Sequence, residues 1–151
     1  MKARRRVVVD TNTLISGVLL SDSMPGQAVR KAIAEDVMLM SEESLYELAD
    51  VLSRKKFDRY LSVKDREEFV RLVLRVAEMV PIVTAVHECR DKSDNRILEV
   101  AVNGSAALIV SGDQDLLTLN PFRRIPVLKP GEYVQETHDA DETTRASEEL
   151  E

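Results

Sequence analysis

The stretch Val7-Val8-Val9-Asp10-Thr11-Asn12 decides the fold that we expect for this chain. Three successive β-branched apolar residues are typical of a strand buried on both faces, as in a parallel sheet covered by helices. The strand stops at a carboxylate, and the apolar positions that follow it have helical spacing. Ligands of parallel α/β sheets bind at the carboxyl ends of the strands, so Asp10 lies where a site is expected. The alternative at this point is that Asp10 only caps the helix that follows.

A second stretch, far downstream, repeats this design. The apolar run at 107–110 is followed by the small polar turn Ser111-Gly112 and then by Asp113 and Asp115. If the two strands are neighbours at the point where the strand order reverses, Asp10 and Asp113 come together. The repetition favours a shared site over two isolated caps.

Extended and helical patterns alternate along the rest of the chain. We expect strands at 7–9, 37–40, 82–83, 107–110 and 125–128, and helices at 14–19, 27–34, 45–52, 62–80, 94–102 and near 116–117. Met24-Pro25-Gly26 is expected to interrupt the first helix, Ser93 to cap the helix at 94–102, and Pro126 to confine the last strand to an edge. This alternation predicts a three-layer α/β/α domain over residues 1–135, with a central parallel sheet of about five strands.

The charge of the chain is unevenly distributed. Residues 136–151 carry seven carboxylates and one arginine, which accounts for the whole formal net charge of −6. We interpret this segment as an acidic, disordered tail, because it has almost no large apolar residues. Residues 1–135 are balanced in charge, so the acidic total does not argue against a polyanionic partner.

Several classes of protein are disfavoured by the sequence. No apolar run approaches the roughly 18 residues of a membrane span, and the basic start is followed by too few apolar residues for a signal peptide. The single cysteine, Cys89, rules out an internal disulfide, and we expect a cytoplasmic protein without membrane contact. The chain contains neither a P-loop nor a G-x-G-x-x-G motif.

The candidates for chemistry are carboxylates, namely Asp10, Glu47, Asp94, Asp113 and Asp115. Hard oxygen ligands suit Mg²⁺ or Mn²⁺, which can support an in-line displacement at a phosphodiester. Each acid also has a plainer explanation: Glu47 on a solvated helix face, Asp94 as a complement to a helix dipole, and Asp113 as a turn residue. If the acids converge without a metal, their repulsion predicts at least one raised carboxyl pKa.

Basic residues form three short clusters, at 4–6, at Arg54-Lys55-Lys56 and at 123–124. Such clusters are most often solvated faces, and the alternative is that they contact RNA phosphates beside an acidic site. Three Tyr, three Phe and no Trp make base stacking a minor mode of recognition.

Four motifs together resemble the PIN-domain family in their order and spacing. They are Val7-Val8-Val9-Asp10-Thr11-Asn12, Glu43-Ser44-Leu45-Tyr46-Glu47-Leu48, Asp91-Lys92-Ser93-Asp94-Asn95 and Val110-Ser111-Gly112-Asp113-Gln114-Asp115-Leu116-Leu117. The resemblance covers about residues 5–135 and is closest to the bacterial and archaeal toxins of toxin–antitoxin systems. It implies a parallel sheet flanked by helices and Mg²⁺- or Mn²⁺-dependent cleavage of single-stranded RNA.

The resemblance also implies roles for individual residues. The positions that match the family's four acids are Asp10, Glu47, Asp94 and Asp113. Asp10, Asp94 and Asp113 would bind the metal together with the additional acid Asp115, and Glu47 would act through a water molecule. Asn12 and Ser111 match the polar positions that support the acids. Asp91 competes with Asp94 for the third acidic position, and we prefer Asp94 because it leads the helix at 94–101.

The sequence therefore predicts a metal-dependent endoribonuclease, the toxin of a toxin–antitoxin pair. Its expected partners are an RNA substrate, a cognate antitoxin and a second copy of the chain in a homodimer. Three alternatives stay open: an RNA-processing nuclease outside toxin–antitoxin function, a non-catalytic RNA- or protein-binding module, and a phosphatase or structure-specific DNA nuclease that uses the same acids.

Overall fold

The computed structural model describes residues 3–136 and contains one parallel sheet of five strands in the order β3-β2-β1-β4-β5. The strands are β1 (Arg6–Val9), β2 (Val37–Met40), β3 (Glu78–Met79), β4 (Leu108–Val110) and β5 (Val127–Leu128). β1 and β4 are neighbours, with Val7 opposite Leu108 and Val9 opposite Val110, which is the condition for Asp10 and Asp113 to come together. The strand order reverses between these two strands, which places the crevice of the sheet at their carboxyl ends.

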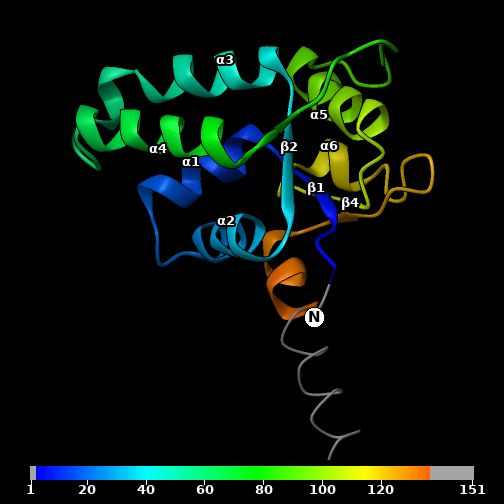
Figure 1. Ribbon diagram of the computed structural model, residues 1–151, viewed down its shortest axis with the longest axis horizontal. Coiled ribbons are helices and arrows are strands. Elements are labelled where there is room, and N and C mark those ends of the chain that lie inside the picture. The colour runs from blue at the N-terminus through cyan, green and yellow to red at the C-terminus, as the bar shows by residue number, and fades with distance from the viewer. Residues whose placement is uncertain (1–2, 137–151) are drawn as a thin grey trace, which may run out of the picture.

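Helices cover both faces of the sheet and complete the expected three layers. They are α1 (Thr11–Leu19), α2 (Met24–Glu35), α3 (Glu42–Leu52), α4 (Val63–Val76), α5 (Lys92–Asn103) and α6 (Gln114–Leu117), with a 3₁₀ turn at Lys55–Phe57. In Figure 1, α1 to α4 lie on one side of β2, and α5 and α6 lie on the other. The alternation of β1 matches this division, because Val7 and Val9 pack in the core with α1–α4 while Val8 packs in the core beneath α5.

The third strand is not where the sequence predicted it. We expected the helix at 62–80 and a strand at 82–83, but α4 ends at Val76 and β3 is Glu78–Met79. Val80 fits the helical stripe of α4 by spacing, yet it belongs to the core on the opposite face from Val73. The chain therefore has to cross the layer of the sheet in an extended conformation, and the Val80 N–H donates to Met40 O at 2.8 Å.

Two helix starts also differ from the prediction. Met24-Pro25-Gly26 opens α2 instead of interrupting a helix. The non-helical segment that separates α1 from α2 is residues 20–23, just before it. Proline suits the first turn because the N–H that it lacks has no partner within the helix. At α5 the cap is Asp91 and not Ser93, since the Asp91 Oδ1 accepts from the Ser93 N–H at 2.8 Å. β5 is shorter than predicted, but it lies at an edge as Pro126 indicated.

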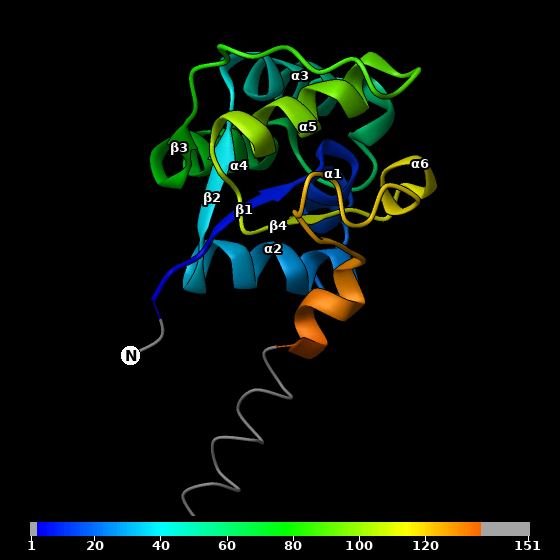
Figure 2. The ribbon, with the colours of Figure 1, turned by 90° about the vertical axis from the view of Figure 1, so that its right-hand side faces the viewer.

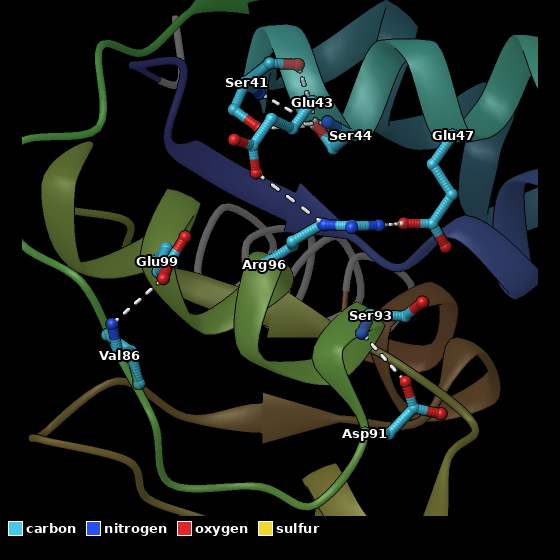
Figure 3. Close-up of polar contacts among 9 residues, drawn as sticks. All are labelled: Ser41, Glu43, Ser44, Glu47, Val86, Asp91, Ser93, Arg96 and Glu99. Atoms are coloured by element: carbon cyan, nitrogen blue, oxygen red, sulfur yellow. Dashed lines mark hydrogen bonds and ion pairs between the residues drawn. The ribbon is translucent and has the colours of Figure 1, made fainter.

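The segment that joins β3 to α5 is fastened along α5 by three side chains spaced four residues apart. Asn95 bonds to both backbone groups of Cys89, Glu99 accepts from the Val86 N–H, and Asn103 accepts from the Val83 and Thr84 N–H groups. Figure 3 shows the contact of Glu99 with Val86. Positions i, i+4 and i+8 share one helix face, so α5 supplies a continuous row of partners for this segment.

Residues 130–136 are helical and lie beside α2 in both ribbon views (Figures 1 and 2). The buried Tyr133 anchors them, because its hydroxyl donates to Asp36 at 2.5 Å and its carbonyl accepts from Lys31 Nζ at 2.7 Å. Burial and the hydrogen bond to Asp36 raise the pKa of Tyr133. Glu136, which we placed in the tail, pairs with Arg5 at 2.6 Å. The rest of the expected tail, 137–151, lies outside the described residues.

Within residues 3–136, we find no helix with the length and apolar character that crossing a lipid bilayer requires.

Candidate metal centre

Two strand ends position the first pair of acids. Asp10 follows β1 and caps α1, and its Oδ1 accepts from the Thr13 N–H at 2.7 Å. Asp113 follows β4 and caps α6. Ser111 joins the two, because its hydroxyl donates to Asp10 Oδ2 and accepts from the Asp113 N–H at 3.0 Å. The predicted supporting role of Ser111 thus corresponds to direct contacts with both acids.

Helices from both faces of the sheet bring further acids to the same place. A hollow of about 100 Å³ is lined by Asp10, Thr11, Asn12, Glu47, Asp91, Ser93, Asp94, Ile97 and Asp113. The structure therefore gathers all four members of the expected quartet, together with the competing Asp91. Asp91 already serves as the cap of α5, whereas Asp94 stands in the first turn with its carboxylate toward the other acids.

Three of the carboxylates are close enough to share one ion. Asp94, Asp113 and Asp115 each offer an oxygen, and these oxygens lie within 4.8 Å of one another. Asp94 is only 7% exposed, and no group among residues 3–136 donates a hydrogen bond to its carboxylate. A buried carboxylate without a donor is stabilised by a cation, and an all-oxygen ligand set fits Mg²⁺ or Mn²⁺.

The electrostatics of Asp94 reflect this crowding. Burial, followed by the negative charges of Asp113, Asp91, Asp115 and Asp10, raises the pKa of Asp94 to about 6. The direction is the one that we predicted for converging acids, but burial is the larger cause and repulsion between the acids the smaller. The neighbouring Cys89 is affected as well, because burial and then the charge of Asp94 raise the pKa of its thiol.

Glu47 reaches the hollow from α3 and is held there by an arginine of α5. The Arg96 Nη1 donates to Glu47 Oε2 at 2.9 Å, and the Arg96 Nε lies 3.7 Å from Glu43 Oε2 (Figure 3). Glu47 is thus partly enclosed, and not on a solvated face as its plainer explanation required. We did not anticipate Arg96, and its position two residues after Asp94 was the only signal in the sequence.

The remaining candidates lie at or beyond the rim. Asn12 lines the hollow, but among the described residues its side chain forms no hydrogen bond to the acids that it was expected to support. Arg54-Lys55-Lys56 lies between α3 and α4, where Arg54 pairs with Asp50 at 3.7 Å. None of these three basic residues lines the acidic hollow.

The site is a group of acids gathered where the strand order of a parallel α/β sheet reverses, with helices on both faces of the sheet, and such a group can hold a divalent cation. A family model described as PIN domain matches residues 6–115. The chain belongs to the PIN-domain family, as the four motifs indicated.

Two relatives extend this result. The chain is 28% identical over 148 residues to an uncharacterized protein of Methanocaldococcus jannaschii, and the match covers 89% of this chain and 93% of that protein. The fold of the present chain is similar to that of a chain in the crystal structure of VapBC2 from Rickettsia felis bound to a DNA fragment from its promoter. That likeness has a TM-score of 0.56 at 11% identity, and it covers 82% of this chain and 98% of the other.

Proposed function

We propose that this protein is an endoribonuclease that cleaves single-stranded RNA with the help of Mg²⁺ or Mn²⁺. The observation that supports this proposal is the group of oxygens of Asp94, Asp113 and Asp115 within 4.8 Å of one another, in which the buried Asp94 has no donor among the described residues. A set of acids that repel one another would also repel RNA phosphates unless a cation bridges the two.

The acids of the hollow and the adjacent Asp115 have separable tasks in this proposal. Asp94, Asp113 and Asp115 hold the ion, and Asp10 joins them from a position that Ser111 and Thr13 keep constant. A divalent ion bound there supplies Lewis-acid activation of water and neutralises charge that develops on the phosphodiester. Glu47, fixed by Arg96, orients the attacking water. Attack by water on phosphorus with loss of the 3′ oxygen leaves 5′-phosphate and 3′-hydroxyl ends.

The biological setting that we propose is that of a cytoplasmic toxin in a toxin–antitoxin pair, acting as a homodimer and inhibited by a cognate antitoxin. Membership of the PIN-domain family and the similarity in fold to a chain of a VapBC2 complex support this setting. Co-expression with the products of neighbouring genes, followed by pull-down, tests it. Failure of every flanking product to co-purify would favour a nuclease that acts alone.

The catalytic proposal is tested with purified protein and end-labelled single-stranded RNA, in Mn²⁺, in Mg²⁺ and with a chelator. We expect cleavage only with metal, and none by Asp10→Asn, which is nearly isosteric but uncharged. Asp50→Asn is the matched control, because it makes the same change at an exposed position of α3. Circular dichroism checks that both variants are folded. Cleavage by Asp10→Asn at the wild-type rate, or cleavage that survives chelation, would contradict the proposal.

A further inference from the structure

A second hollow, of about 240 Å³, adjoins the acidic one on the side of α1 and α2. It is lined by Asp10, Asn12, Thr13, Ser16, Pro25, Gly112, Asp113 and Pro130. The two hollows share Asp10, Asn12 and Asp113 and differ in the rest of their lining. Apart from the residues that the two hollows share, the second hollow is lined by two hydroxyl side chains, two prolines and a glycine, and by no further carboxylate.

The sizes and linings suit different parts of a nucleic acid strand. The acidic hollow, at about 100 Å³ and with five carboxylates, has room for a cation and water, and it repels phosphate unless a cation is bound there. The second hollow is smaller than the roughly 300–1,000 Å³ of typical small-molecule sites, which limits it to one nucleoside. An extended strand whose phosphate lies at Asp10 and Asp113 would place an adjacent nucleoside there.

Thr13 is the group in this hollow that most needs a ligand. It is only 5% exposed, and its backbone N–H donates to Asp10, yet its hydroxyl has no hydrogen-bond partner among residues 3–136. Buried hydroxyls are nearly always satisfied, so one without a partner requires an explanation. Ser16 lies three residues further along α1, on the same helix face, and its hydroxyl is also unpartnered in the described part of the chain.

The remaining lining leaves the hollow open and gives it rigid walls. A Cβ added at Gly112 would meet no atom within 4 Å, so this glycine is not required by packing and keeps space free beside Asp113. Pro25 and Pro130 supply the apolar part of the lining, which suits a base better than a phosphate.

We infer that this hollow binds the nucleoside next to the cleaved phosphate, and that Thr13 and Ser16 contact its ribose 2′-hydroxyl. A hydroxyl both donates and accepts, and the 2′-hydroxyl is the group that distinguishes RNA from DNA at a given site. The inference rests on the proposed function for its substrate class, but its test measures binding and does not require cleavage.

The experiment compares fluorescein-labelled single-stranded RNA with DNA of the same sequence by anisotropy in Ca²⁺, with gels to check that the strands stay intact. We expect the wild type to bind RNA more tightly than DNA. Thr13→Val and Ser16→Ala each lower the RNA affinity about threefold to tenfold, the effect of one hydrogen bond between neutral groups, and leave the DNA affinity unchanged. Thr84→Val is the matched control, because it removes an exposed hydroxyl outside both hollows.

Two further measurements separate the possible results. Thr13→Val is isosteric, and the shift in melting temperature on adding Mn²⁺ shows whether the acids are undisturbed. If Thr13→Val loses that shift, its RNA affinity no longer reports on the hydroxyl alone, and the RNA affinity of Ser16→Ala decides the test. The inference is overturned if the wild type binds neither strand, if it binds both equally, or if both variants keep the wild-type ratio of affinities. A protein that binds RNA with this ratio and never cleaves it overturns the nuclease proposal and supports the subsite.

Discussion

Replacing Asp94 by asparagine should stabilise the metal-free protein at neutral pH. Burial, followed by the negative charges of Asp113, Asp91, Asp115 and Asp10, raises the pKa of the Asp94 carboxyl from 3.8 to about 6. Each pKa unit corresponds to 1.36 kcal/mol, so the ionised form of Asp94 lowers the stability of the fold by about 3 kcal/mol at most. The asparagine would carry no charge, and it replaces a side chain that accepts no hydrogen bond from the described residues.

The size of the effect changes with pH in a defined window. The folded pKa lies above the ordinary value, so the folded state retains the proton longer than the unfolded state as the pH rises. Wild-type stability should therefore fall between pH 3.8 and about 6 and then level off. Below this window both states hold the proton, and the advantage of Asp94→Asn should vanish.

The assay is urea unfolding followed by circular dichroism, with chelator, at about pH 4 and about pH 7.5. Asp50→Asn, an exposed change on α3, controls for the loss of one charge. A repeat with Mn²⁺ should remove most of the advantage of Asp94→Asn at neutral pH, because the wild type gains about 2.7 kcal/mol at 100 times its dissociation constant and the variant gains less. An Asp94→Asn protein that is less stable than the wild type at neutral pH, or whose advantage is the same at both pH values, would refute the reasoning.

Three other results are expected. Arg96→Gln should slow RNA cleavage in a single-turnover gel assay by roughly tenfold or more, because Glu47 loses the guanidinium that positions it; partial rescue by Arg96→Lys would distinguish positioning from folding, and equal rates would exclude it. Tyr133→Phe should lower the urea stability by about 1–3 kcal/mol, because the buried Asp36 loses a donor, and an unchanged midpoint would contradict this anchor. Mn²⁺ or Mg²⁺ should raise the wild-type melting temperature in differential scanning fluorimetry and leave that of Asp10→Asn nearly unchanged; equal shifts would exclude Asp10 from the metal centre.

The parts of the fold that were predictable depend on local chemistry. The β-branched run Val7–Val9 of β1 is typical of a strand buried on both faces, and a carboxylate at its end marked the crevice. The same pattern repeated at 107–113 favoured a shared site, and the pairing of β1 with β4 fulfils the condition for it. The acids of the quartet were found because the type and order of the residues carry the signal.

What could not be predicted depends on which face of the sheet a residue packs against. Val80 continues the stripe of α4 by spacing, and only the position of the second core shows that it belongs elsewhere. Arg96 and Glu47 are 49 residues apart and meet only because α3 and α5, from opposite faces of the sheet, approach each other at the acidic hollow. In the sequence, Asn95, Glu99 and Asn103 look like any polar helix face. Only the structure shows that they bond to the backbone of the segment at 82–89.

Asp10, Asp91 and Asp113 each cap a helix, of α1, α5 and α6 respectively, in addition to lining the hollow. Asparagine and serine cap helices about as well as aspartate, and neither carries a negative charge to a cation. A single base change from an aspartate codon to an asparagine codon would therefore remove the charge and keep the helix start. The negative charge of the hollow can thus be removed one codon at a time while each helix keeps its cap, so the fold does not depend on the site that it carries.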